Sequence, residues 1–149
     1  MGGEVARGAR GDDGGEVVRH RGNGTALMVV HGIGIGALPY WGIIKALLRE
    51  GPVVVAHHPY VSVRYAPTCP DLTQTASAYV DVLEAYSLDG ACIVSHSFGT
   101  AIASWLVQYK PDVVKGVVLL DPAVLCIHLR KLLFNFIYAR QALDSVPVC

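Results

Sequence analysis

The sequence lacks a net charge, because its 12 lysines and arginines are balanced by 12 acidic residues. Nucleic-acid-binding domains usually carry a basic excess, so nothing here points to a nucleic-acid partner. The chain also lacks an uninterrupted apolar run of about 18 residues, the length that a membrane-spanning helix needs. The best candidate, residues 113–127, is broken by Lys115 and Asp121. We therefore expect no transmembrane segment.

The four cysteines lack paired or metal-ligand spacing, and among the six histidines His57 and His58 are adjacent rather than on one helix face. We expect no metal site and no cofactor. The N-terminus has no apolar core of the signal-peptide kind, and its arginines are balanced by acids, which argues against a transit peptide. A cytoplasmic location is the default expectation.

What the chain has in abundance is apolar residues, which make up 52% of its 149 positions. High apolar content with little charge suits parallel strands that are covered on both faces. We expect three regions. Residues 1–24 form a disordered tail rich in Gly, Arg and Asp, residues 25–122 form the folded core, and residues 123–149 form a lid or cap helix with an irregular end.

Apolar runs alternate with helical patterns along the core. The runs are typical of buried strands and lie at residues 26–30, 53–56, 91–94 and 116–120. Three segments have helical spacing. The first is residues 39–50, and the second begins after Asp71, which caps it with Gln74 as its capping-box partner. The third follows the apolar run 91–94 and ends near Lys110. This alternation predicts an α/β fold with three layers, α/β/α, and a mostly parallel sheet.

The stretch Ile93-Val94-Ser95-His96-Ser97-Phe98-Gly99-Thr100 predicts a strand that turns directly into a helix with Ser97 at the apex. Such a nucleophile elbow needs small residues two positions either side of the apex, and Ser95 and Gly99 meet that need. Ser95 stands where the usual G-x-S-x-G pattern has its first Gly, and His96 adjoins the apex. The alternative is an ordinary Ser-rich helix N-cap.

The loop His31-Gly32-Ile33-Gly34 follows the first predicted strand and suits an oxyanion loop, in which backbone N–H groups approach a developing negative charge. Either Ile33 or Gly34 would supply one donor, and Phe98 the other. A rival interpretation is the dinucleotide fingerprint G-x-G-x-x-A, ending at Ala37. That interpretation expects an acidic residue after the second strand, where the sequence has none.

With both loops in place, residues 25–121 resemble the α/β-hydrolase superfamily, in particular its AB-hydrolase-1 type. The shared segments are residues 31–36 with Pro39-Tyr40, 59–64, 95–100 with 103–105, and 121–122 leading into 135–138. The resemblance implies that Ser97 is the nucleophile and that Ile33 and Phe98 are the oxyanion donors. Asp121 ends the strand after the elbow, where some relatives carry the acid, and an Asp-Pro turn that closes a strand is the alternative.

The resemblance also implies a histidine base after the last strand. The sequence offers no suitable one, because His128 follows Asp121 too closely and His96, next to Ser97 at the elbow, points away from it. Three further histidines, His31, His57 and His58, are more typical of loop or pocket residues. We therefore expect the N-terminal portion of a hydrolase fold, arising from an incomplete gene model, a splice product or a degenerate copy.

Three functions stay open. The first is a serine hydrolase, esterase- or lipase-like, that acts on an ester, lactone, thioester or amide of a small molecule. The second is an inactive hydrolase-like domain that binds a lipid, a small molecule or a protein. The third is a dinucleotide-binding oxidoreductase. The apolar and basic residues 124–143 favour an acyl substrate, with contact to a membrane surface as the less favoured alternative.

Overall fold

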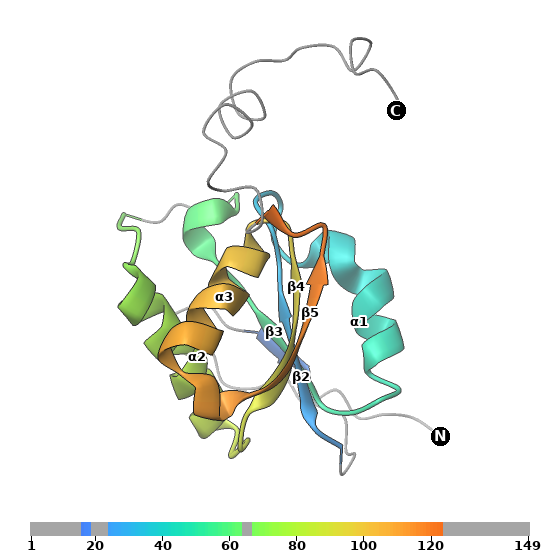
Figure 1. Ribbon diagram of the computed structural model, residues 1–149. Helices are drawn as coiled ribbons and strands as arrows, with labels where there is room; N and C mark the ends of the chain where they lie inside the picture. Colours follow the sequence, from blue (N-terminus) through green and yellow to red (C-terminus); the bar gives the residue numbers. More distant parts are fainter. Residues whose placement is uncertain (1–15, 19–23, 64–66, 124–149) are drawn as a thin grey trace, which may run out of the picture.

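The computed structural model describes residues 16–18, 24–63 and 67–123. They form a five-stranded sheet with the strand order β1-β3-β2-β4-β5 (Figure 1). The expected lid helix, and His128 within it, lie outside the described residues.

The four strands that follow the tail are parallel to one another. They are β2 (Ala26–Val30), β3 (Val53–Ala56), β4 (Ala91–His96) and β5 (Val114–Leu120). Parallel neighbours need a crossover between them, which the helical segments of the chain provide. The carboxyl ends of these strands meet at the upper edge of the sheet in Figure 1.

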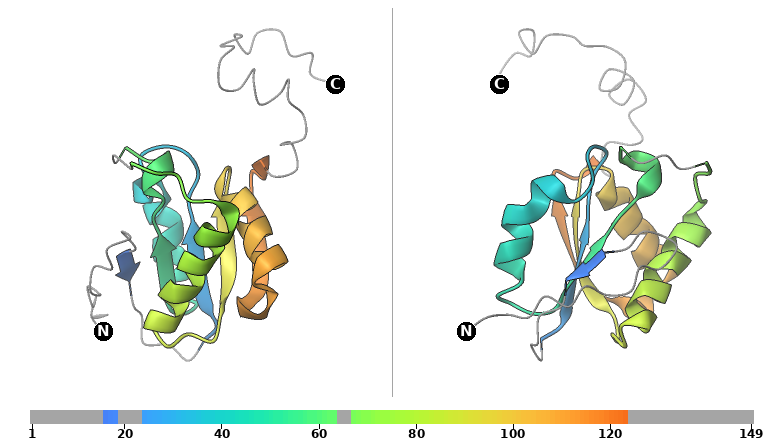
Figure 2. Two further views of the ribbon diagram at one scale, coloured as in Figure 1. Left: turned by 90° about the vertical axis from the view of Figure 1, so that its left-hand side faces the viewer. Right: turned by 180° about the vertical axis from the view of Figure 1, so that it is seen from behind.

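Helices cover both faces of the sheet, as the two views of Figure 2 show. Helix α1 (Trp41–Leu47) lies on one face, while α2 (Leu72–Ala85) and α3 (Gly99–Tyr109) lie on the other. Three short 3-10 turns connect these elements: η1 (Leu38–Tyr40), η2 (Pro59–Val61) and η3 (Pro111–Val113). The predicted three-layer α/β fold with a mostly parallel sheet is confirmed.

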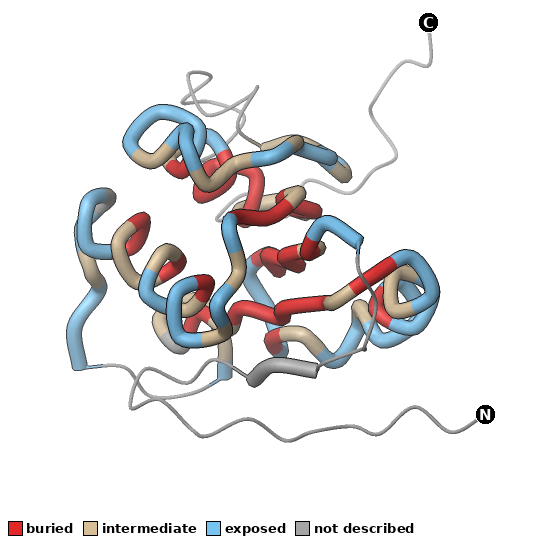
Figure 3. Tube along the Cα trace, turned by 90° about the horizontal axis from the view of Figure 1, so that it is seen from below, coloured by how far each residue is buried: buried red, intermediate tan, exposed pale blue. Residues whose placement is uncertain are grey.

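The core lies on the two sides of the sheet, in the red segments at the centre of Figure 3. Side chains of β2 point alternately to opposite faces, so Met28 and Val30 pack with α2 and α3, while Val29 packs with Ile44 of α1. Burial on both faces explains why this strand is a continuous apolar run rather than an alternating one.

The structure differs from the sequence-based prediction at several places. A short strand β1 (Glu16–Val18) pairs antiparallel with β3, within the segment expected to be a disordered tail. Helix α1 begins at Trp41 rather than Pro39, because η1 occupies the positions before it. Strand β5 begins at Val114, and its apolar Val117, Val118 and Leu119 are each about two-fifths exposed rather than covered.

The start of α2 is as predicted. The Asp71 carboxylate accepts a hydrogen bond from the Gln74 backbone N–H at 2.8 Å, and the Gln74 side-chain oxygen accepts one from the Asp71 N–H at 3.0 Å. This reciprocal pair satisfies two N–H groups that a helix N-terminus otherwise leaves without partners.

Candidate active site

Ser97 lies at the apex of a sharp turn between β4, which ends at His96, and α3, which begins at Gly99. Its φ is +50°, in the left-handed region that is strained for a residue with a side chain. The Ser97 N–H donates to the Leu120 carbonyl of β5 at 3.1 Å. Its carbonyl accepts bonds from the Thr100 N–H and hydroxyl at 3.0 and 2.6 Å. The backbone is therefore held on both sides of the predicted apex.

The small residues beside the apex are required by close packing. A Cβ on Gly99 would overlap the Val30 carbonyl oxygen and stand 2.8 Å from that of His31, so α3 could not approach β2 with any larger residue there. Ser95 is fully buried, and its hydroxyl donates to the Val118 carbonyl at 3.3 Å. A serine is accommodated in place of the usual glycine because a backbone carbonyl of the neighbouring strand accepts a hydrogen bond from its buried hydroxyl.

The loop after β2 lies directly against the Ser97 side chain, since a Cβ on Gly32 would stand 2.9 Å from the Ser97 Cβ. The Gly34 N–H already donates to the Val61 carbonyl at 3.0 Å. Of the two N–H groups considered for an oxyanion donor, Ile33 is therefore the better placed, since no hydrogen bond among the described residues uses its N–H.

His31 determines which way that N–H points. Its Nδ1 lies 2.7 Å from the Gly32 carbonyl oxygen, and its Nε2 accepts the His58 backbone N–H at 3.0 Å. Since a carbonyl only accepts and an N–H only donates, we assign the proton to Nδ1. The Gly32 carbonyl and the Ile33 N–H belong to one planar trans peptide and point in opposite directions. The Ile33 N–H therefore points away from the His31 ring.

Three histidines, His31, His57 and His58, gather at the carboxyl ends of β2 and β3. The ring centre of His31 lies 5.3 Å from that of His57 and 4.8 Å from that of His58. Burial, with the nearby rings of His31 and His57, lowers the pKa of His58 from 6.5 to about 3. Burial also lowers the pKa of His31, opposed in part by its bond to Gly32. These two rings are neutral at pH 7.

The cluster is held by hydroxyl groups. The Tyr79 hydroxyl of α2 lies 2.5 Å from His58 Nε2, and the Ser62 hydroxyl lies 3.0 Å from His57 Nε2. His31, His57 and His58 thus connect the loop after β2 to the segment around η2 and to α2.

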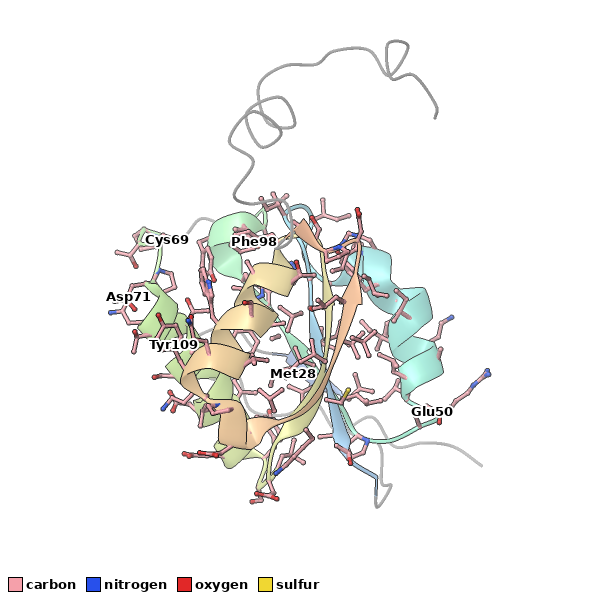
Figure 4. All side chains as sticks on the ribbon, in the orientation of Figure 1. Met28, Glu50, Cys69, Asp71, Phe98 and Tyr109 are labelled. Carbon is pink, nitrogen blue, oxygen red and sulfur yellow. The ribbon has the colours of Figure 1, made fainter. Side chains whose placement is uncertain are left out.

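Asp121 and Ser97 share one edge of the sheet, because Asp121 directly follows β5 and the preceding Leu120 carbonyl bonds to Ser97. Asp121 is exposed and has a φ of +45°. His96 has its Nδ1 at 2.7 Å from the Tyr40 hydroxyl. Phe98, the other expected oxyanion donor, follows Ser97 and lies at the upper end of the fold in Figure 4, whereas Met28 lies within the sheet.

Sequence reasoning gave no role to Tyr40, whose hydroxyl contacts both the Gly32 N–H and His96. The sequence signals are an aromatic hydroxyl close after a glycine-rich loop and the place of Pro39-Tyr40 among the segments shared with the hydrolase family. Within the described part of the chain, no cluster of three or more His, Cys, Asp or Glu side chains could hold a metal ion. No helix among those residues has the length and apolarity needed to cross a membrane.

The sequence model of the alpha/beta hydrolase fold family matches residues 25–139, which is most of the chain. The protein belongs to this family. A search among curated proteins finds no match. The family identification agrees with the resemblance expected from the two loops.

Solved structures with this fold include carboxylesterase CesB from Bacillus subtilis, at 15% identity and a TM-score of 0.67, with 83% of this chain and 44% of that chain covered. A hydrolase from Pseudomonas aeruginosa PA01 is 20% identical, with a TM-score of 0.61 and coverage of 80% and 46%. The 2-hydroxy-6-oxo-6-phenylhexa-2,4-dienoate hydrolase from Rhodococcus sp. strain RHA1 is 20% identical, with a TM-score of 0.64 and coverage of 79% and 46%. These likenesses show the shared fold.

The chain is shorter than the proteins it resembles. It spans 38% of the matched chain of Cfl2 from Burkholderia cenocepacia and 63% of that of a hydrolase from Thermoplasma acidophilum.

Proposed function

We propose that the protein is a serine hydrolase, or the part of one that carries the nucleophile, and that it acts on an ester, lactone, thioester or amide of a small molecule. The observation that carries this proposal is the strained Ser97 apex, with a φ of +50° and Gly32 packed against its side chain. A non-glycine residue in this conformation is uncommon, and such strain concentrates at functional sites.

In this mechanism the Ser97 oxygen attacks the substrate carbonyl carbon, and the carbonyl electron pair moves to the oxygen. The Ile33 and Phe98 N–H groups donate to that oxyanion, and one such donor is typically worth about 10²–10³ in rate. The tetrahedral species then expels the alcohol, thiol or amine and leaves an acyl-serine. Attack by water on this acyl group releases the acid and restores Ser97.

The Ser97 proton needs a base within about 3 Å. His31 and His96 already use ring nitrogens toward Gly32 and Tyr40, respectively. In the proposal, we place the base outside the described residues, where His128 also lies. The proposal assigns the acid to Asp121 because this residue lies at the same edge of the sheet as Ser97.

A hydrolase-like binding protein is the second candidate. The engagement of His31 and His96 in structural hydrogen bonds favours it, because without a base only the oxyanion donors and binding contribute, about 10³–10⁴-fold over water. A dinucleotide-binding function gains nothing from the structure, since α1 begins only at Trp41, beyond the glycine loop. The cytoplasmic location stays a prediction.

A fluorophosphonate probe tests the proposal, since it phosphonylates activated serines. The full chain is incubated with the probe, and the modified peptide is identified by mass spectrometry. We expect label on Ser97, loss of label in Ser97→Ala, and full label in Ser104→Ala, which removes an exposed hydroxyl from α3. A folded wild-type protein that stays unlabelled would favour the binding function.

A further inference from the structure

The two proposed oxyanion donors belong to segments far apart in the sequence. Ile33 follows β2, whereas Phe98 lies in the turn between β4 and α3. Both N–H groups must reach one oxygen atom at about 2.7–3.1 Å, so the separation of the two segments has to be fixed before the reaction begins.

One hydroxyl group connects these two segments. The Tyr40 oxygen accepts a hydrogen bond from the Gly32 N–H at 3.1 Å and lies 2.7 Å from His96 Nδ1. Gly32 directly precedes Ile33, and His96 is the last residue of β4, two positions before Phe98. The hydroxyl therefore joins the loop to the turn immediately beside each proposed donor.

A backbone N–H can only donate, so the Tyr40 oxygen accepts from Gly32. We assign the Tyr40 proton to the bond with His96 Nδ1, which lies 2.7 Å from the hydroxyl oxygen. This arrangement places the His96 ring proton on Nε2. The two rings also meet edge to face, with centres 5.4 Å apart.

The position of the tyrosine is itself restrained. Its backbone N–H donates to the Ala37 carbonyl at 3.0 Å in η1, and its half-buried ring packs against the core cluster of Val29, Ile44, Val53 and Val55. The ring would keep this packing without its hydroxyl. Tyr40→Phe therefore removes the two hydrogen bonds and little else.

We propose that Tyr40 is a positioning residue that sets the distance between the Ile33 and Phe98 oxyanion donors by hydrogen-bonding both Gly32 and His96. The inference rests on the proposed serine hydrolase function. It assigns to Tyr40 no contact with the substrate: its effect on catalysis passes through the two backbone segments that it joins.

The test uses the full chain and an aryl trifluoromethyl ketone. The Ser97 oxygen bonds to the ketone carbon, the carbonyl pair becomes an oxyanion, the Ser97 proton leaves to solvent, and no group is expelled. Fluorine NMR separates this adduct from the free ketone. The matching trifluoromethyl carbinol, which cannot form an oxyanion, reports ordinary binding to the same surface.

We expect Tyr40→Phe to weaken the ketone affinity at least about tenfold, a fraction of the loss seen when a donor is removed outright, and to leave carbinol affinity unchanged. Tyr109→Phe, which removes an exposed hydroxyl near the end of α3, is the matched control and should bind both as wild type does (Figure 4). Nitrogen-15 NMR should show the His96 proton on Nε2 in the wild type and a mixture of tautomers in Tyr40→Phe.

Variants at His96 keep the test decisive if Tyr40→Phe does not fold. His96→Asn retains an acceptor near the Nδ1 position and should keep most of the ketone affinity, whereas His96→Ala should lose as much as Tyr40→Phe. Equal ketone affinity in wild type, Tyr40→Phe and His96→Ala would overturn the inference, and so would a parallel loss of carbinol affinity. A wild type that forms no more adduct than Ser97→Ala would instead remove the proposed function, and the inference with it.

Discussion

The Ser97 side chain lies against the α-carbon of Gly32, so close that a Cβ added there would stand 2.9 Å from the Ser97 Cβ and 3.3 Å from His96 Nδ1. Real Cβ atoms do not approach carbon atoms this closely, and one of the two segments would have to move. The loop after β2 and the elbow therefore fit each other only with glycine at position 32.

Gly32→Ala should slow fluorophosphonate labelling of Ser97 at least about tenfold, because the displaced loop carries the Ile33 donor with it. Labelling rates and thermal melting are measured together. Gly42→Ala is the control, since a Cβ at that exposed position of α1 meets nothing within 4 Å. It should label normally and gain up to about 1 kcal/mol of stability, because alanine is the better helix former. Labelling of Gly32→Ala at the wild-type rate would contradict the assignment of the loop.

His31 variants test the direction of the Ile33 N–H. His31→Leu removes the donor to the Gly32 carbonyl and should slow labelling of Ser97 by about tenfold or more, since the peptide is then free to rotate. His31→Asn keeps a donor near the Nδ1 position and should recover part of the rate. If both variants remain folded and label at the same rate as each other, the hydrogen bond between His31 and the Gly32 carbonyl is not what orients this peptide.

Stability should fall as the solution is acidified below pH 6.5. The pKa of His58 is about 3 in the folded chain and 6.5 when unfolded, so between these values the unfolded state binds the extra proton. The free energy of unfolding is then highest above pH 6.5 and falls by up to about 1.4 kcal/mol per pH unit towards pH 3. His31, whose pKa is also lowered, acts in the same direction.

Urea unfolding at several pH values between about 4 and 7 measures this slope. The range is chosen because the folded and unfolded pKa values of His58 are about 3 and 6.5. In His58→Asn the new side chain does not titrate in this pH range. The free energy of unfolding should therefore depend less steeply on pH, by up to about 1.4 kcal/mol per pH unit, the contribution of one proton. An unchanged slope in that variant would show that the His58 ring is protonated in the folded protein.

Asp71→Ala should cost about 1 kcal/mol of stability without changing the Ser97 labelling rate, because the capping box at the start of α2 satisfies backbone N–H groups and nothing at the elbow. Chemical unfolding gives the first quantity and probe labelling the second. Thr73→Ala, at an exposed position in the same turn, should change neither by a measurable amount. A labelling defect in Asp71→Ala would link α2 to the site.

Patterns local in the sequence predicted most of the fold. Apolar runs gave the four parallel strands, and small residues around Ser97 gave the sharp turn. Glu16–Val18 was missed because its mixed composition resembles a tail, while its pairing partner β3 lies far along the chain. Intrinsic preference is weak for so short a segment, and the antiparallel partner decides its structure.

The site was predicted less completely, because its details depend on hydrogen bonds between distant segments. The Val61 carbonyl accepts the Gly34 N–H, which favours Ile33 over Gly34 as the proposed donor. The bridge from Tyr40 to His96 spans 56 positions. Such contacts cannot be predicted from periodicity or residue spacing, because they form only once the strands have paired.

The left-handed backbone at Ser97 also bears on the stability of the fold. A left-handed conformation costs a residue with a side chain about 1–2 kcal/mol, a cost that glycine escapes. Ser97→Gly should therefore melt at a higher temperature than the wild type while losing the hydroxyl. At this one position, the residue best for folding and the residue proposed for catalysis are different, and the chain carries the less stable of the two.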